Sequence, residues 1–135
     1  MIVRVKKQLG SKVIMIDKRK VLLLKRASKS VTDRSPWVWD LPGGHIDEGE
    51  NPVAAGRREV VEETDLIVGR LNFLGTDSNI GKKTYFYSTE QWDGGIKLSH
   101  EHEDYRWVVA EDVSKYQYAV GSMYYKMIMK ALKTR

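Results

Sequence analysis

Apolar residues in the first third of the chain form two short runs with a polar turn between them. Residues 12–16 and 21–25 are rich in leucine and β-branched side chains, and residues 17–20 are charged. Two such runs around a short polar turn are typical of a β-hairpin. The following residues, 26–38, are polar and include Pro36, so we interpret them as a loop.

The clearest helix signal begins at Asn51. Asparagine is a preferred N-cap residue, and Pro52 suits the first helical position. The pattern predicts a helix that continues to about Thr64. Its apolar side, which we expect to face the core, consists of Val53, Ala54, Val60, Val61 and Thr64.

The rest of the chain alternates between strand and turn signals and ends in a second helix. We predict strands at residues 66–75, 83–89 and 105–109, turns at residues 77–81 and 92–95, and a helix at residues 123–132. Short strands with two helices indicate an α/β protein, with a mixed sheet covered by helices. No linker divides the chain, so residues 1–135 are predicted to form one domain.

Composition excludes several classes of function. The 135 residues include no cysteine, which rules out disulfide scaffolds, zinc–thiolate sites, iron–sulfur clusters and thiol nucleophiles. No apolar run approaches the roughly 20 residues of a transmembrane helix, and the N-terminal residues lack the apolar core of a signal peptide. We therefore expect a cytoplasmic protein with no membrane partner.

Charge is unevenly distributed along the chain. The net charge is +5, yet residues 44–65 contain seven acidic and two basic side chains. A basic surface favours anionic partners, whereas a compact acidic cluster needs a cation. Phosphate esters handled through a divalent metal ion would satisfy both requirements.

Three glutamates of the predicted helix lie on one side of it. Glu59, Glu62 and Glu63 have the spacing i, i+3 and i+4, which places them within a sector of about 100°. Carboxylate oxygens are the ligands that Mg²⁺ prefers. On spacing alone, a metal site and a solvated acidic surface remain equal alternatives.

The wider pattern around these glutamates resembles the Nudix box. Gly44 is followed after five residues by Glu50 and after seven more by Arg-Glu-Val-Val-Glu-Glu-Thr-Asp-Leu at residues 58–66. The one departure is Asp65, where the family has glycine. Residues 39–44 (Trp-Asp-Leu-Pro-Gly-Gly) resemble the segment that precedes the family's box. The resemblance implies the Nudix α/β/α sandwich, with a mixed sheet between helices.

The resemblance also implies a reaction, the hydrolysis of a pyrophosphate bond in a nucleoside diphosphate derivative by a metal-activated water. The Gly44 carbonyl and the carboxylates of Glu59, Glu62 and Glu63 would hold Mg²⁺ or Mn²⁺. Catalytic roles fall to Arg58, which would hold a carboxylate in place, and to Glu62 as a candidate general base. Glu101 is the alternative base or an extra metal ligand.

Other residues have candidate roles around this centre. Glu103 is a reserve for Glu101, and the resemblance implies that Glu50 would support the junction of loop and helix or bind an outer-shell water of the metal. His100 and His102 could grip a transition metal, although a polar loop is the simpler interpretation. The predicted substrate-binding residues are Arg26, Trp37, Lys83 and Tyr87, with Lys82 as a further candidate phosphate contact. Cations suit phosphate oxygens and aromatic rings can stack a base, with core packing as the alternative for the aromatic residues.

The substrate class stays open between nucleoside triphosphates, dinucleoside polyphosphates and nucleotide sugars. Residues 96–102 and 105–107 resemble asymmetrical diadenosine tetraphosphate hydrolases, but these typically have Pro-Lys-Gly-His where this chain has Pro-Gly-Gly-His at residues 42–45. The alternative function is a non-hydrolytic nucleotide sensor or RNA-binding module. The intact set of three glutamates favours hydrolysis. Oligomeric state is left open, with a homodimer as one option.

Overall fold

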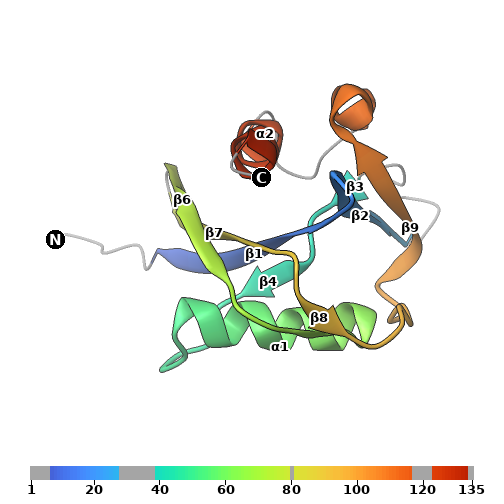
Figure 1. Ribbon diagram of the computed structural model, residues 1–135. Coiled ribbons are helices and arrows are strands. Elements are labelled where there is room, and N and C mark those ends of the chain that lie inside the picture. Colours follow the sequence, from blue (N-terminus) through green and yellow to red (C-terminus); the bar gives the residue numbers. More distant parts are fainter. Residues whose placement is uncertain (1–6, 28–38, 80, 117–122, 134–135) are drawn as a thin grey trace, which may run out of the picture.

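A computed structural model describes residues 7–27, 39–79, 81–116 and 123–133, and its described strands lie between two helices (Figure 1). The main sheet has the strand order β3-β2-β1-β7-β6, with β4 also pairing with β1 and β9 with β2. Its strands are β1 (Gln8–Asp17), β2 (Lys20–Arg26), β3 (Trp39–Asp40), β4 (Gly43–His45), β6 (Asn72–Asn79), β7 (Lys82–Thr89) and β9 (His102–Val109). The long parallel pair β1–β7 among antiparallel neighbours makes this sheet mixed, as predicted.

The predicted hairpin is confirmed. Strands β1 and β2 pair antiparallel, with Asp17 opposite Lys20. The two residues between them, Lys18 and Arg19, have φ angles of 49° and 65°, in the left-handed region. Two-residue turns of this kind match the twist of the strands that they join. Strand β1 begins earlier than its apolar run because its first half pairs with β7 and β4.

Helix α1 (Pro52–Thr64) has the predicted bounds. The Asn51 side chain accepts a hydrogen bond of 2.8 Å from the Ala54 amide. The helix ends at Asp65, whose φ of 64° is left-handed and whose amide bonds to the Val61 carbonyl. This is where the Nudix box has glycine, and aspartate is among the residues that tolerate the conformation.

The predicted apolar side of α1 is wrong in part. Ala54 and Val61 are exposed, while Gly56 and Glu63 are buried with Val60. Gly56 lies so close to β1 that a Cβ atom there would come within 3.0 Å of the Ser11 hydroxyl oxygen. The helix therefore turns Ala55, Gly56 and Glu63 inward, which its apolar pattern does not show.

Two predicted elements differ because they depend on pairing far along the chain. The strand predicted at residues 66–75 is divided into β5 (Ile67–Val68) and β6, and β6 continues into the predicted turn. The turn predicted at residues 92–95 contains β8 (Trp92–Asp93), which pairs with β5 in a separate small sheet. Strand β9 also begins three residues earlier than predicted.

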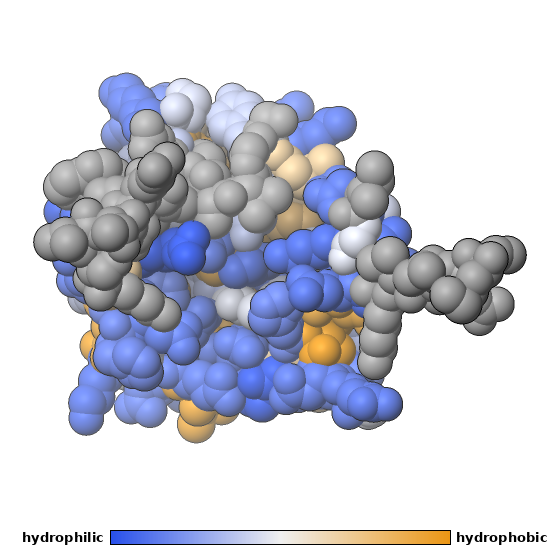
Figure 2. Space-filling model, turned by 180° about the vertical axis from the view of Figure 1, so that it is seen from behind, coloured by the Kyte–Doolittle hydropathy of each residue, from blue (hydrophilic) through white to orange (hydrophobic). Residues whose placement is uncertain are grey.

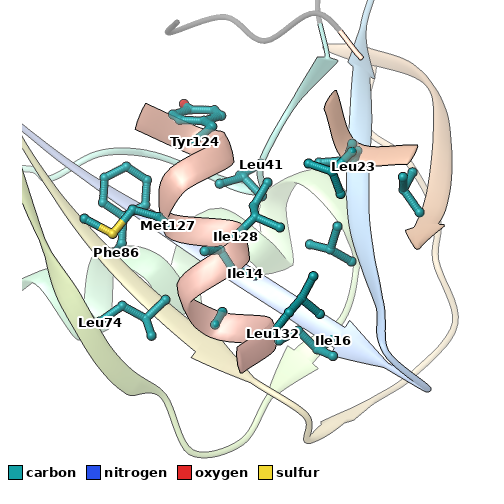
Figure 3. Close-up of a cluster of buried hydrophobic side chains, with 14 residues drawn as sticks. Ile14, Ile16, Leu23, Leu41, Leu74, Phe86, Tyr124, Met127, Ile128 and Leu132 are labelled. Atoms are coloured by element: carbon teal, nitrogen blue, oxygen red, sulfur yellow. The ribbon is translucent and has the colours of Figure 1, made fainter. Parts of the chain in front are cut away.

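Each face of the sheet has its own core. Ile14 and Phe86 pack under α2 (Met123–Lys133), in the cluster that Figure 3 shows around that helix. Val13 and Leu22 face the other way, towards Val60 of α1. This alternation along β1 follows from the two-residue period of a strand. Helices on opposite faces confirm the α/β/α sandwich. A short 3₁₀ helix, Ala110–Lys115, follows β9.

Among the described residues, neither α-helix is long and apolar enough to cross a membrane. The face that Figure 2 shows is mostly hydrophilic, with hydrophobic side chains in small patches.

Candidate active site

A polar pocket opens where α1, strand β4 and the starts of β7 and β9 meet. Its volume is about 540 Å³. It brings together five predicted metal or catalytic positions, one predicted substrate-binding residue and the further candidate Lys82. The charged side chains in its lining are Lys12, Arg26, Asp40, Glu59, Glu62, Glu63, Lys82 and Glu101.

Arg58 connects the carboxylates at the entrance to this pocket. Its guanidinium donates two hydrogen bonds to Glu50, of 2.9 and 3.0 Å, and others to Glu59 at 3.0 Å and Glu62 at 3.1 Å. Such forked, charge-assisted bonds are stronger and more directional than neutral ones. The bond from Arg58 lowers the pKa of Glu50, and Glu50 accepts from the Asp47 amide as well. Arg58 therefore orders the loop before α1 together with two candidate metal ligands.

Glu63 is the buried member of the glutamate set. It is 6% exposed, and its Oε1 accepts a hydrogen bond of 2.7 Å from the Gly43 amide. Burial raises the pKa of Glu63 to about 8, against the opposing effects of Lys12 and the Gly43 amide. Burial also raises the pKa of Glu59, although Arg58 opposes it. Glu63 thus gains a negative charge near neutral pH more readily once a cation is bound beside it.

Two glycines let the backbone of β4 approach these carboxylates. A Cβ atom on Gly44 would lie 2.7 to 2.9 Å from the Glu59 carboxylate, so a larger residue there would displace that carboxylate. Gly43 has a φ of 137° and packs directly on β1. These contacts explain why a glycine pair precedes the acidic helix.

The pairing of β4 with β1 decides which carbonyl is available. The Val13 amide donates to the Pro42 carbonyl at 2.9 Å. Hydrogen-bonded and non-hydrogen-bonded pairs alternate along an antiparallel ladder, so the next pair, Lys12 and Gly43, is of the non-hydrogen-bonded kind. The N–H and C=O of Gly43 therefore point away from β1, which agrees with their bonds to Glu63 and Lys12. Gly44 forms the next pair, with Ser11, which is of the hydrogen-bonded kind, so the Gly44 carbonyl points towards β1.

The start of β9 forms the opposite wall. Glu101 lines the pocket, and its carbonyl accepts from the Ala27 amide at 2.9 Å. His102 is 7% exposed, and its Nε2 lies 3.9 Å from Glu63 Oε2. Its Nδ1 has no hydrogen-bond partner among the described residues, and burial lowers its pKa. Glu103 points elsewhere and forms an ion pair of 3.6 Å with Lys25.

The predicted substrate-binding residues fall in different places. Arg26 lines the pocket, whereas Lys83 and Tyr87 do not. Lys82 and Thr84 line it instead, so the alternation of β7 puts Lys83 and Tyr87 on the other face. Trp37 lies outside the described residues.

Tyr85 and Tyr87 of β7 share one face of the strand, while Phe86 takes the other and lies in the core under α2. Tyr87 is 6% exposed and packs against Phe73 with ring centroids 5.6 Å apart, while the Lys83 ammonium lies 5.1 Å from the centre of the Tyr85 ring. Trp39 and Trp107 pack against neighbouring rings, Tyr116 and Trp92 respectively, in agreement with the core-packing interpretation.

Among the residues of the pocket wall that the sequence interpretation missed are Lys12, Asp40 and Tyr124. Tyr124 lies on α2 in the cluster of Figure 3, and its pKa is raised, mainly by burial. Lys12 offered one signal, since it is a charged residue at the start of an apolar strand run. Asp40 and Tyr124 offered none, because only the folded chain brings them together.

The donor set suits a hard divalent cation. The described residues contain no group of three or more acidic or histidine side chains already gathered in metal-binding geometry. Glu59 and Glu62 are instead turned to Arg58. Even so, three carboxylates and a glycine carbonyl face one pocket, and all of them offer oxygen, the ligand that Mg²⁺ and Mn²⁺ prefer. The residues present therefore fit such an ion.

Comparisons with known proteins agree with this geometry. Two curated relatives are enzymes acting on nucleotides. An 8-oxo-dGTP diphosphatase of Buchnera aphidicola is 32% identical over 78% of this chain and 79% of its own length. A mouse asymmetrical bis(5'-nucleosyl)-tetraphosphatase is 32% identical over 55% of this chain and 57% of its own length.

A solved structure and a family model support the same assignment. The MutT NUDIX hydrolase of Burkholderia pseudomallei superposes with a TM-score of 0.74 at 20% identity, over 93% of this chain and 98% of that one, which shows a shared fold. The NUDIX domain model matches residues 6–128. The chain therefore belongs to the NUDIX family of hydrolases.

Proposed function

We propose that this protein hydrolyses a pyrophosphate bond in a nucleoside diphosphate derivative and depends on Mg²⁺ or Mn²⁺ to do so. The observation that carries the proposal is the pocket itself. Glu59, Glu62 and Glu63 line one wall, and Arg26 and Lys82 lie in the same lining. Carboxylates suit a metal ion and fixed cations suit phosphate oxygens, so this pocket fits a metal-bound diphosphate.

The metal ligands would be the oxygens of Glu59, Glu62 and Glu63 with one glycine carbonyl. The family resemblance points to the Gly44 carbonyl, whereas the strand pairing leaves the Gly43 carbonyl directed away from β1. We assign Gly43 to this role on that ground. When bound, the ion would neutralise phosphate charge and lower the pKa of a bound water.

The chain's own groups would orient and deprotonate the attacking water. The Glu62 side chain is 55% exposed and bonds to Arg58, so it has room to reach a water in the pocket. Glu101 is available across the pocket for the same proton or for a metal contact. Arg58 would hold the carboxylates of Glu59 and Glu62 in place while substrate binds.

Phosphate recognition would come from Arg26 and Lys82, which line the pocket, in place of Lys83. The matched relatives are named for 8-oxo-dGTP and bis(5'-nucleosyl) tetraphosphates. Nucleoside triphosphates and dinucleoside polyphosphates are therefore the first substrates to try, followed by nucleotide sugars and ADP-ribose.

Turnover across this nucleotide panel, with Mg²⁺, with Mn²⁺ and with EDTA, tests the proposal. We expect metal-dependent cleavage of one substrate class. Cleavage of a triphosphate releases either pyrophosphate or phosphate, so chromatography of the products identifies the bond that is cleaved. Glu62→Gln and Glu63→Gln should each remove most activity. Glu48→Gln is the matched control, since this exposed acid lies in the loop before α1 and does not line the pocket. Full activity in EDTA, or nucleotide or RNA binding without any turnover, would contradict the proposal.

A further inference from the structure

Lys12 is a buried lysine beside the proposed metal site, and none of the roles assigned above uses it. The residue is 8% exposed and lies in the middle of β1. Burying an ammonium group costs several kcal/mol unless it is paired and hydrogen-bonded. The groups that contact Lys12 therefore indicate what its charge is for.

Within the described part of the chain, its hydrogen bonds and ion pair are all to one short segment, residues 40–43. The ammonium lies 3.1 Å from Asp40 Oδ1, and it donates to the Leu41 carbonyl at 3.2 Å and the Gly43 carbonyl at 3.3 Å. A lysine ammonium has three protons. Three acceptors from the chain use all of them, which leaves no proton for a substrate phosphate.

This segment carries the backbone group that holds Glu63. The Gly43 carbonyl is bound by Lys12, and the Gly43 amide donates to Glu63 Oε1 at 2.7 Å. Neither group is used in the ladder between β1 and β4, because Lys12 and Gly43 form a non-hydrogen-bonded pair. Gly43 is therefore oriented from one side by Lys12 and from the other by Glu63.

We propose that Lys12 is a positioning residue, whose ammonium fixes residues 40–43 so that the Gly43 amide holds Glu63 in the pocket. Its effect on turnover rests on the hydrolysis proposed above, whereas its effect on the Gly43 amide does not. Charge is the essential property, because two of the three contacts are to carbonyls and the third is to a carboxylate. A neutral side chain of the same length would fill the space and leave Asp40, at 15% side-chain exposure, without its cation.

The absence of cysteine from the chain allows a direct test of charge against shape. Lys12→Cys introduces a single thiol, which can be alkylated in denaturant before the protein is refolded. Treatment with 2-bromoethylamine gives a side chain as long as lysine that ends in an ammonium group. Treatment with 1-bromopropane gives one of the same length that ends in a methyl group. Lys12→Met, expressed without alkylation, provides a second neutral variant that needs no refolding.

Two measurements separate a positioning role from other roles. Amide hydrogen exchange of Gly43, followed by NMR, reports the bond to Glu63, with the Lys97 amide on the Thr64 carbonyl as internal control. Steady-state kinetics at saturating Mg²⁺ separate kcat from KM. In both neutral variants we expect Gly43 exchange to accelerate by about tenfold or more relative to Lys97. We also expect kcat to fall in them with little change in KM, and both quantities to return in the aminoethylated protein.

Two results would overturn the proposal, and a third would separate it from a failure of the proposed function. If the propylated protein and Lys12→Met match the aminoethylated protein in exchange and kcat, the charge has no positioning role. If KM rises while kcat and Gly43 exchange stay unchanged, Lys12 binds substrate instead. If the unaltered protein hydrolyses no nucleotide, the proposed function fails, but the exchange measurements still decide whether Lys12 positions Gly43.

Discussion

The Gly43 amide and the Glu63 carboxylate are joined by a hydrogen bond of 2.7 Å across the boundary between β4 and α1. This bond ties the glycine turn to the one glutamate of the set that is almost fully buried. A buried carboxylate with a single backbone donor is poorly compensated as an anion. The arrangement is therefore suited to holding Glu63 in place while leaving its charge to be satisfied by a cation.

Metal binding should release a proton near neutral pH. The pKa of Glu63 is raised to about 8, so most metal-free molecules carry a protonated Glu63 at pH 7. A metal ion needs the carboxylate form, and its affinity should rise as pH increases towards 8 and level off above it. Calorimetric titration with Mg²⁺ in buffers of different ionisation enthalpy measures the protons released. A metal affinity that is flat between pH 6 and 8, with no proton release, would contradict this prediction.

The stability of the metal-free protein should also depend on Glu63. Its pKa is about 8 in the folded state against an ordinary 4.5, so the folded state binds the proton more tightly than the unfolded state. The contribution of Glu63 to stability is therefore fully present below about pH 4.5 and is lost as pH rises through 8. We expect the urea midpoint of the EDTA-treated protein to fall over this window, and Glu63→Gln to reduce the slope. An unchanged slope in that variant would assign the pH dependence to other groups.

Local signals in the sequence predicted α1 and the acidic part of the site well. The cap at Asn51 and the stop at Asp65 depend on a few adjacent residues, so the helix bounds follow from the sequence alone. The glutamate spacing likewise needs only helical geometry. By contrast, the pairing of Ile67 with Asp93 joins segments far apart in the chain, and the second segment carries the turn signal of residues 92–95.

The sequence also does not show which face of β7 is turned towards the pocket. It shows only that Tyr85 and Tyr87 share a face of the strand. The answer depends on the register of β7 against β1, where Thr84 lies opposite Gly10 and both line the pocket. Lys83 consequently lies on the far side, although it is adjacent in sequence to the pocket residue Lys82.

The guanidinium geometry of Arg58 should matter beyond its charge. Its Nε and Nη2 donate to Glu50 and its Nη1 donates to both Glu59 and Glu62, a planar three-nitrogen arrangement that a lysine cannot reproduce. We expect Arg58→Lys to lower kcat by about tenfold or more, in the range seen when groups that orient metal ligands are removed. Arg70→Lys, at an exposed position, is the matched control. Equal kcat values in the two variants would show that charge alone is sufficient.

Gly44→Ala should impair the site with little effect on the fold. The new methyl group would lie 2.7 to 2.9 Å from the Glu59 carboxylate, so the carboxylate must move. A displacement of about 1 Å at a reacting centre can reduce turnover by about 100-fold, and we expect a loss of that order. Gly95→Ala is the control, because a Cβ atom there meets nothing within 4 Å and the position has no positive φ.

Circular dichroism and a urea titration would show whether the Gly44→Ala variant stays folded, and kcat with saturating Mg²⁺ gives the catalytic effect. A loss of activity that follows a loss of folded protein would point to the strand pairing of β4 instead of Glu59. Retained activity in a folded variant would mean that the Glu59 carboxylate has another position from which it can serve the reaction. Only a folded, inactive Gly44→Ala protein beside a fully active Gly95→Ala protein places the effect at the contact between β4 and the glutamate helix.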